Sequence, residues 1–309
     1  MVCKYPYVQR EGFVFGCGQC LPCRLNKRRE WTARILLESM KSDKACFVTL
    51  TYSPEKVPYA ADENGIPVTG SLEPEDVRLF LYRLRKRLKP RKFRYYIVGE
   101  YGEKSERPHY HGAFFGMDRA DQEHFEAAWK DPEDHEPIGF VDVGDLTNDS
   151  AQYIAGYVTK KLSSEDSRMH GRYPEFSRQS NRPGIGASAV EDLLKDFDCT
   201  SVKKHIEVNG DLPKDIKVNG KTYPLGRYLM EKLRLGYGLS DGGAPERIRQ
   251  EHKEKMLAMY ASYTADAKNV SPQNGRTVEK VRQTFIQGNA QKVLNKEKRY
   301  EIFNQRSKI

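Results

Sequence analysis

The chain has 309 residues, of which 52 are Lys or Arg and 43 are Asp or Glu, so its formal net charge is +9. This length allows a large core, and the excess of positive charge favours a polyanionic partner without identifying one. No apolar run approaches the ~18 residues of a membrane span, and the start MVCKYPYVQR lacks the apolar core of a signal peptide. These features argue against a membrane protein and predict a cytosolic protein with reduced cysteines.

The first half of the chain has the clearest pattern of secondary structure. Apolar residues at helical spacing and segments rich in β-branched and aromatic residues alternate along it. The sequence predicts, in chain order, a basic helix over 24–40, a strand over 46–52, a loop over 53–73, a helix over 74–88, strands over 94–100 and 109–116, a helix over 119–130, a strand over 138–144 and a helix over 150–162.

After the first helix, these elements follow the order strand, helix, strand, strand, helix, strand, helix. This order is typical of ferredoxin-like and RNA-recognition-type folds. We therefore predict an α+β fold, in which an antiparallel sheet carries helices on one face.

The pattern weakens after residue 163. The stretch SRQSNRPGIGAS has the composition of a loop, YPLGRYLMEKLRLGYGL contains a short predicted helix, and the chain from Pro245 onward is polar and predicted to be helical. The sequence thus predicts four parts: a cysteine-rich segment with a basic helix over 1–40, the main domain over 41–165, a loop-rich extension over 166–243 and a polar helical region over 244–309.

Two histidines, His109 and His111, lie in the predicted strand RPHYHGAFFG. Side chains at positions i and i+2 of a strand point to the same face, so two imidazoles there can share one cation. Two histidines and one carboxylate leave coordination positions open for water or substrate, as a catalytic metal requires. Glu100 is the preferred third ligand because it lies on a strand, whereas Glu103 and Glu106 lie in the following turn. The alternative is a pair of surface histidines beside an ordinary strand-end charge.

The segment YIAGYVTKK places two tyrosines, Tyr153 and Tyr157, one turn apart on a predicted helix, about 6 Å along its axis. Lys160 and Lys161 continue the same stripe. A phenol with a pKa near 10 is a poor nucleophile at neutral pH, but a nearby cation and a polarised phosphodiester would activate it. Two such phenols could act successively on one phosphate. The alternative is a pair of core-facing aromatics, with lysines that complement the helix dipole.

Four cysteines lie close together near the start of the chain. Cys17, Cys20 and Cys23 form C-x₂-C-x₂-C, and Cys3 can supply a fourth thiolate for a structural Zn²⁺. Tight cysteine runs also hold iron–sulfur clusters, and reduced buried thiols are a further alternative.

A strongly basic run, RLRKRLKPRKFR, spans residues 83–94 and contains eight basic residues and no acidic ones. Such a run can follow a DNA backbone, because phosphate contacts position a strand without reading its sequence. The alternative is the solvated face of a helix. The candidate DNA-binding residues are Arg83, Arg85, Lys86, Arg87, Lys89, Arg91, Lys92 and, from the tyrosine helix, Lys161.

Taken together and in order, FVTLTY, PHYHG and YIAGYVTKK resemble the three motifs of HUH endonucleases, the superfamily of rolling-circle replication initiators and relaxases. Similar viral initiators have a Glu several residues before the first metal-binding His, and Glu100 occupies that place. Two tyrosines followed by lysine resemble the two-tyrosine branch. The stretches CGQCLPCRLNKRREW and RQSNRPGIG are similar to the initiators of gokushovirus-type Microviridae phages. The resemblance covers about residues 1–240.

The resemblance implies an HUH endonuclease domain with a ferredoxin/RRM-like fold. It implies a protein that binds the phage origin, as single-stranded DNA or in the supercoiled replicative form, and nicks one strand. One of Tyr153 and Tyr157 would become joined to the 5′ side, and the other would later cleave the regenerated origin so that a single-stranded circle is released. Lys160 would assist the phenol, with Lys161 as a second candidate. A divalent metal, Mg²⁺ or Mn²⁺, is implied at the histidine pair, and histidine ligands favour Mn²⁺.

Several partners and rival functions follow from the same resemblance. The 3′-hydroxyl would prime a host DNA polymerase, and a host helicase is implied because the sequence lacks a Walker motif. The expected location is the cytoplasm of the bacterial host. Rival interpretations are another HUH enzyme (a plasmid initiator, relaxase or transposase), a non-catalytic nucleic-acid-binding module on an RRM-like sheet, and a 2-His-1-carboxylate Fe(II) oxygenase. The last would not explain the helix with its tyrosines and lysines.

Overall fold

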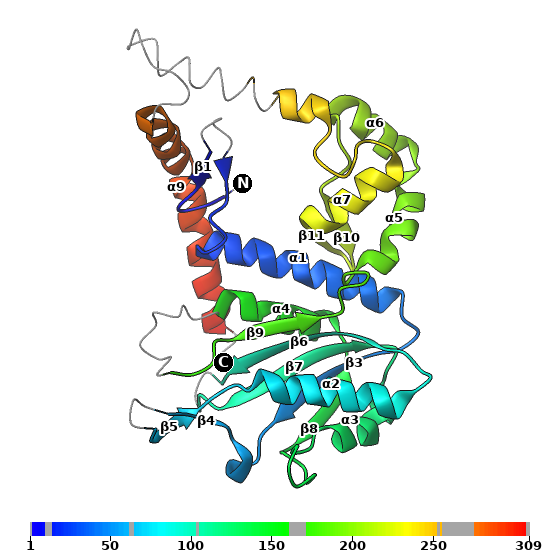
Figure 1. Cartoon of the computed structure of the whole chain (residues 1–309). Coiled ribbons are helices and arrows are strands. Elements are labelled where there is room, and N and C mark those ends of the chain that lie inside the picture. The colour runs from blue at the N-terminus through cyan, green and yellow to red at the C-terminus, as the bar shows by residue number, and fades with distance from the viewer. Residues whose placement is uncertain are drawn as a thin grey trace. The chain divides into compact units, whose positions relative to one another are not determined.

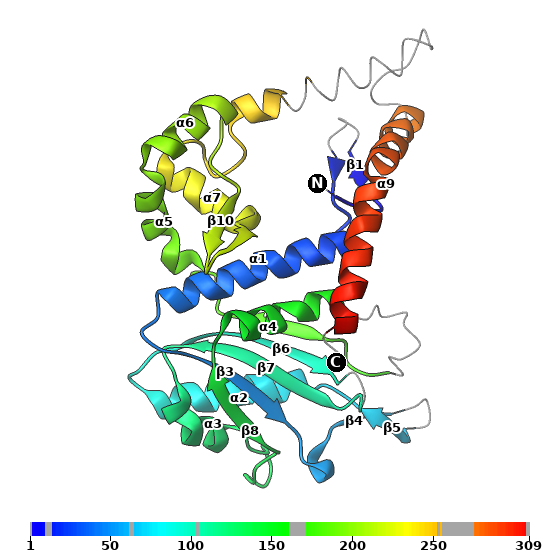
Figure 2. The same ribbon diagram turned by 180° about the vertical axis from the view of Figure 1, so that it is seen from behind.

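The computed structural model of the chain describes residues 2–9, 14–61, 65–102, 105–160, 171–251, 254 and 275–306. The chain divides into two compact units, and Figures 1 and 2 show their elements from opposite sides. Unit 1 consists of Met1–Lys27, Leu193–Asp215 and Gly226–Ile309, and unit 2 consists of Arg28–Asp192 and Ile216–Leu225.

Unit 2 is built on a five-stranded antiparallel sheet with the strand order β8-β3-β7-β6-β9. The strands are β3 (Ala45–Thr51), β6 (Arg94–Tyr101), β7 (Pro108–Phe115), β8 (Val141–Asp145) and β9 (Phe176–Gln179). The main helices of this unit are α2 (Pro74–Leu88), α3 (Gln122–Ala128) and α4 (Asn148–Lys160), together with most of α1 (Leu21–Met40). The predicted α+β class and the predicted order of strands and helices from β3 to α4 are confirmed.

Helices lie on both faces of this sheet, so the prediction of one helical face is wrong. Figure 2 shows α2 and α3 on one side of the sheet and α4 and the unit 2 part of α1 on the other. On the α1 side, the ring of Trp31 packs 4.6 Å from that of Tyr96, centroid to centroid. The physical reason is visible in β6 and β7, whose side chains are buried on both faces, since a sheet that is apolar on both faces must be covered twice.

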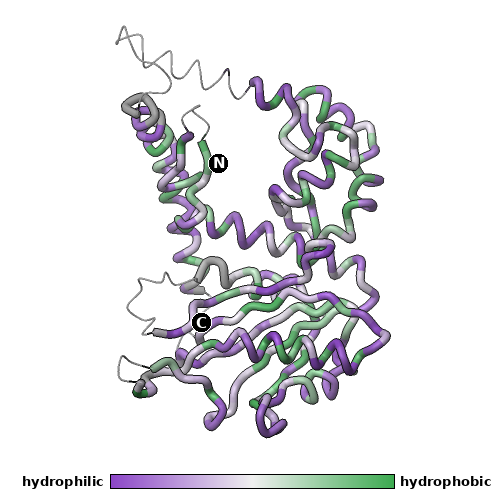
Figure 3. The backbone as a smooth tube through the Cα atoms, viewed as in Figure 1, coloured by the Kyte–Doolittle hydropathy of each residue, from purple (hydrophilic) through white to green (hydrophobic). Residues whose placement is uncertain are grey.

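The main core lies between the sheet and the pair α2 and α3. α2 begins with Pro74 at its first position, and the Glu73 side chain accepts a hydrogen bond from the Glu75 amide. Its buried residues recur at helical spacing and face the sheet: Val77, Phe80, Leu81, Leu84 and Leu88. In Figure 3 green and white segments run through the central strands of the sheet.

One polar network is buried in this core. The Tyr52 hydroxyl lies 2.7 Å from a carboxylate oxygen of Asp76 and 2.9 Å from the hydroxyl of Tyr110. Burial raises the pKa of both tyrosines, so both phenols stay protonated and their hydrogen bonds stay satisfied at neutral pH. The opposite face of the sheet presents other residues, because side chains alternate along each strand.

The sequence missed several short elements. The predicted loop 53–73 contains the 3₁₀ turn η1 (Pro54–Lys56) and a hairpin of β4 (Tyr59–Ala61) and β5 (Pro67–Gly70), and β9 adds an edge strand to the main sheet. Further missed elements are η4 (Ala187–Ala189), α5 (Val190–Phe197), α6 (Thr200–Asn209) and the hairpin of β10 (Asp215–Val218) and β11 (Lys221–Pro224), whereas the predicted helix over 119–130 begins as the 3₁₀ turn η2 (Arg119–Asp121). The missed elements are so short that hydrophobic periodicity in the sequence gives little indication of a helix or strand.

Unit 1 contains the hairpin of β1 (Tyr7–Val8) and β2 (Val14–Phe15), the start of α1, most of α5, and the helices α6, α7 (Gly226–Tyr237) and α9 (Gly275–Arg306). The predicted short helix over 223–239 corresponds to α7, and α9 confirms helix in the polar C-terminal region. Within this unit, Arg234 donates two hydrogen bonds, of 2.9 and 2.7 Å, to the buried carboxylate of Asp211. No described helix is long and apolar enough to cross a membrane.

Candidate active site

The three predicted metal ligands meet on one face of the sheet in unit 2. Antiparallel pairing of β6 with β7 sets Glu100 directly opposite His109, and His111 follows two residues later on the same face. The Glu100 carboxylate oxygen Oε1 lies 3.3 Å from His109 Nε2 and 3.6 Å from His111 Nε2. One ligand atom from each residue lies within 4.8 Å of the other two, which is the spacing that a single cation needs.

Neighbouring groups orient both imidazole rings. His109 Nδ1 lies 3.0 Å from the Arg107 carbonyl oxygen, so this nitrogen carries the proton and donates it. His111 Nδ1 lies 3.0 Å from the Thr49 hydroxyl on β3. Phe47, also on β3, stacks on the His111 ring at a centroid distance of 5.4 Å. Partners of this kind at Nδ1 are how proteins hold a histidine so that Nε2 can bind a metal.

The donor set fits a divalent cation with open coordination positions. Two imidazole nitrogens and one carboxylate oxygen suit Mn²⁺ and other transition metals, and Mg²⁺ accepts the carboxylate together with water or phosphate oxygens. The Glu100 side chain is only 3% exposed, whereas those of His109 and His111 are 17% and 10% exposed. A buried carboxylate between two imidazoles is costly unless a positive charge accompanies it.

Glu106 and Glu103 were the alternative candidates for the third ligand. Glu106 pairs with Arg172 at 2.9 Å, and Glu103 lies outside the described residues. Among the described residues, the geometry therefore supports Glu100 as the third ligand.

A phenol from α4 reaches this cluster. α4 begins with a reciprocal cap, in which the Ser150 amide donates to the Thr147 hydroxyl at 3.2 Å and the Thr147 amide donates to the Ser150 hydroxyl at 2.7 Å. The helix buries small and apolar residues, Ala151, Ile154 and Ala155, and it contacts β6 and β7.

Packed in this way, α4 places the Tyr153 hydroxyl 2.9 Å from Glu100 Oε1, to which it donates, and 3.4 Å from His111 Nε2. Tyr153 as a whole remains 44% exposed. A partly exposed phenol beside a candidate metal site is accessible to a bound substrate.

The other residues predicted on this helix cannot be placed. The backbones of Tyr157 and Lys160 belong to α4, but their side chains lie outside the described residues, as does all of Lys161. Their roles stay predictions.

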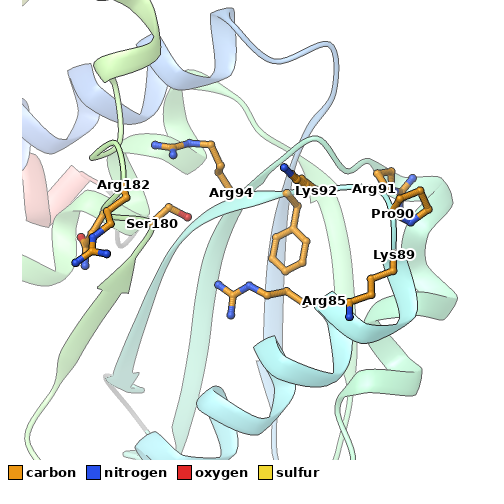
Figure 4. Close-up of a pocket in the computed structure, with 10 residues that line it drawn as sticks. Arg85, Lys89, Pro90, Arg91, Lys92, Arg94, Ser180 and Arg182 are labelled. Carbon is orange, nitrogen blue, oxygen red and sulfur yellow. The ribbon is translucent and has the colours of Figure 1, made fainter.

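Several residues of the basic run line a pocket of about 620 Å³ in unit 2 (Figure 4). The C-terminal end of α2 and the start of β6 form one side of the pocket, and the segment after β9 forms the other. Its lining residues are Arg85, Lys89, Pro90, Arg91, Lys92, Phe93, Arg94, Ser180, Asn181 and Arg182. Six of these ten are basic and none is acidic, so the pocket suits an anionic ligand.

The cations of the basic run are not equivalent. Arg91 pairs with Asp121, and Arg83, outside the pocket, donates to the Lys130 carbonyl. Within the described part of the chain no carboxylate pairs with Lys89 or Lys92, and both are exposed. The remaining predicted residues, Lys86 and Arg87, are exposed on α2 and do not line the pocket.

The four predicted cysteine ligands also come together, in unit 1. The sulfurs of Cys3, Cys17, Cys20 and Cys23 all lie within 4.8 Å of one another, and all four residues are free thiols. Burial acts to raise the pKa of the Cys17 thiol, but hydrogen bonds from the backbone amides of Cys20 and Gln19 outweigh it and lower the pKa to about 7.

Sequence reasoning missed several residues that shape these sites. Thr49 and Phe47 orient His111, and the carbonyl of Arg107 orients His109. Alternation along CFVTLTY, the strand next to the histidines, was the signal that could have found Thr49. Arg182 joins the basic pocket from a segment about 90 residues away in sequence, which no local pattern predicts.

Comparison with known proteins shows which proteins the chain resembles around the site. A family model described as Replication-associated protein ORF2 matches residues 45–162, the segment that contains Glu100, both histidines and α4. Residues 45–162 are thus similar to this family of replication-associated proteins. The expected resemblance to phage replication proteins is confirmed.

Individual proteins that the chain is similar to come from phages. It is 32% identical over 194 residues to the Replication-associated protein VP4 of Bdellovibrio phage phiMH2K, which covers 58% of each chain. It is 37% identical over 182 residues to the Replication-associated protein ORF2 of Spiroplasma virus 4, which covers 55% of each. A third relative, ORF4 of Chlamydia phage 1, is 24% identical over 252 residues, 74% of this chain and 56% of that protein.

The chain thus spans little more than half the length of each of these relatives. No solved structure gives a significant match.

Proposed function

We propose that this chain is a phage rolling-circle replication initiator, which nicks one DNA strand at the origin through a covalent 5′-phosphotyrosine intermediate. The observation that carries the proposal is the position of the Tyr153 hydroxyl, 2.9 Å from Glu100 and 3.4 Å from His111. A nucleophile beside a metal-ligand cluster is the arrangement that phosphoryl transfer needs. The match of residues 45–162 to replication-associated proteins supports the same biological role.

In the proposed reaction the Tyr153 oxygen attacks the scissile phosphorus. A bond forms between this oxygen and phosphorus, and the bond from phosphorus to the 3′-oxygen breaks. The phenol loses its proton, and the leaving 3′-oxygen gains one, so the products are a 5′-phosphotyrosine and a free 3′-hydroxyl. One ester replaces another, so the step needs no ATP.

A divalent cation held by Glu100, His109 and His111 would supply Lewis-acid polarisation of the phosphate and would help to orient it. Mn²⁺ and Mg²⁺ are the proposed ions. The contribution of the chain is to fix the ligand atoms: Thr49 and the Arg107 carbonyl hold the two rings, and β6 holds the carboxylate.

The second half of the proposed cycle assigns a role to Tyr157. It would cleave the regenerated origin, and the released 3′-hydroxyl would then attack the first phosphotyrosine, which restores the first phenol and closes a DNA circle. Lys160 would stabilise the negative charge near the phenols, with Lys161 as the second candidate. Extension of the nicked strand would require a host polymerase and helicase, in the cytoplasm of the host.

The arrangement of the sheet is consistent with a ferredoxin-like HUH domain. Apart from the added edge strand β9, the strand order β8-β3-β7-β6 is the order that a split β-α-β unit produces. We propose this fold assignment on topology and motif order.

We also propose that the basic pocket binds the DNA backbone. It lies at the start of β6, where Arg94 begins the strand, whereas Glu100 lies near its end. Six residues along a strand correspond to roughly 20 Å. The pocket would therefore contact phosphates several nucleotides from the scissile bond.

The double variant Lys89→Ala, Lys92→Ala is expected to bind single-stranded DNA roughly ten-fold more weakly. Loss of two phosphate contacts should also reduce the slope of log Kd against log salt by about 1.4, since each contact releases counterions. Titration of fluorescent oligonucleotides at several salt concentrations measures both quantities. The matched control is Lys86→Ala, Arg87→Ala, which removes the same charge from the same run outside the pocket. Equal effects of the two double variants would refute the assignment of the pocket.

The best rival function is a non-catalytic DNA-binding module, since a basic pocket alone would serve either role. The two functions differ in one product. The full chain is to be incubated with Mn²⁺ and single-stranded oligonucleotides that together cover the genome encoding it. We expect one sequence to yield a protein–DNA adduct that survives boiling in detergent, and we expect a chelator to prevent it. Binding without an adduct at any sequence would instead support the binding module.

A further inference from the structure

The cysteine cluster of unit 1 is assembled from two pieces of chain, one before and one after the β1–β2 hairpin. Cys3 precedes β1, Cys17 and Cys20 lie between β2 and α1, and Cys23 lies in the first turn of α1. The hairpin of β1 and β2 brings Cys3 back beside the other three cysteines. Burial is graded, because Cys3 and Cys20 are buried and the other two are partly exposed.

The spacing of the sulfurs fits one tetrahedral ion. A Zn²⁺–S bond of about 2.3 Å places two sulfurs of a tetrahedron about 3.8 Å apart. The Sγ atoms of Cys3 and Cys20 are 3.8 Å apart, and all four lie within 4.8 Å of one another. A multi-iron cluster has several metal ions between its cysteine sulfurs and needs a wider spacing.

Backbone amides point at the sulfurs. Cys3 Sγ accepts from the Cys17 amide at 3.2 Å, and Cys20 Sγ accepts from the Lys4 amide at 3.4 Å. Cys17 Sγ accepts from the amides of Gln19 and Cys20 at 3.4 and 3.3 Å. Such donors stabilise negative charge on sulfur and orient the ligands, as partners of metal ligands do.

We propose that Cys3, Cys17, Cys20 and Cys23 bind one Zn²⁺ ion that has a structural role. Four protein ligands fill a tetrahedral shell, which leaves no position for substrate. This site is therefore distinct in kind from the three-ligand cluster of unit 2.

The zinc site would also hold the C-terminal helix of unit 1. β1, next to Cys3, contacts α9, and the neighbouring Lys4 pairs with Glu297 at 3.3 Å. Asn26, one turn after Cys23, accepts a hydrogen bond of 3.0 Å from Lys296. Since the hairpin and the start of α1 are short and small elements, the metal would fix the surface on which α9 packs.

The test is the metal content of the full chain after purification without added metal. We expect about one zinc per chain, retained by Glu100→Gln and by Cys199→Ser, whose thiol is exposed and outside the cluster, and lost from Cys20→Ser. Because Cys20→Ser can fail to fold, wild-type protein is also to be reconstituted with Co²⁺, which should give the visible absorption of a tetrahedral thiolate site.

Limited proteolysis gives the third measurement. Removal of zinc from the wild type should increase cleavage within α9, while cleavage within α2 should be unchanged. Iron in place of zinc, zinc lost from Glu100→Gln but kept by Cys20→Ser, or a cobalt complex without thiolate bands would each overturn the proposed site. Unchanged cleavage of α9 would overturn its structural role.

Discussion

Exchange of Tyr153 for phenylalanine is expected to reduce covalent adduct formation by on the order of 10³-fold or more, because the substitution removes the attacking oxygen while keeping the aromatic ring. DNA affinity should be unchanged, since the phenol is not a phosphate-binding charge. The measurement is the rate at which radiolabelled oligonucleotide becomes resistant to extraction from denatured protein.

Three companion variants make this result specific. Tyr82→Phe removes a phenol that is 60% exposed on α2, and it should retain full activity. Tyr157→Phe and the double variant, with mass-spectrometric mapping of the adduct, separate the two tyrosines of α4. Wild-type rates in Tyr153→Phe, with every adduct mapped elsewhere than on α4, would exclude the proposed nucleophiles.

Glu100→Gln is expected to lower nicking by on the order of 100-fold or more, since it removes the one negative charge of the ligand cluster while keeping its size. It should also abolish stabilisation by metal. At one hundred times its dissociation constant, Mn²⁺ stabilises the folded state by about 2.7 kcal/mol, which corresponds to a rise in Tm of roughly 5–10 °C. Thermal unfolding with and without Mn²⁺ measures this rise independently of activity.

The matched control is Glu106→Gln. This carboxylate is close in sequence, but it pairs with Arg172 rather than with the histidines. It should keep both the nicking rate and the rise in Tm with Mn²⁺. If Glu106→Gln loses the metal response and Glu100→Gln keeps it, the third ligand has been misassigned.

The covering of the sheet shows where sequence reasoning reached its limit. RYYIVGE and HYHGAFFG were predicted as strands from their composition, and the corresponding strands β6 and β7 are buried on each face. Nearly continuous apolar runs indicate a sheet covered on both sides. The order of elements along the chain does not determine that α4 packs on the face of the sheet opposite α2 and α3. The packing of α4 depends on contacts between distant segments.

The basic run and the cysteines show the same limit of sequence reasoning. Composition identified both, and spacing made Cys17, Cys20 and Cys23 candidates for one metal. The structure distinguishes the cations of the run by their neighbours: Arg182 lines the same pocket, and Asp121 pairs with Arg91. Both of these neighbours lie far from the run in sequence. Similarly, only the β1–β2 hairpin brings Cys3 to the other three sulfurs.

The sequence by itself determined which side chains share a strand or helix face, because residue spacing and backbone geometry are local. On that basis it placed His109 and His111 together and Tyr153 one turn from Tyr157. Only the tertiary structure decided that Glu100 faces His109 and that the Tyr153 hydroxyl reaches Glu100. Strand register and helix packing are set by burial of residues from distant segments, so the distances that turn three motifs into one candidate site appear only when the chain is folded.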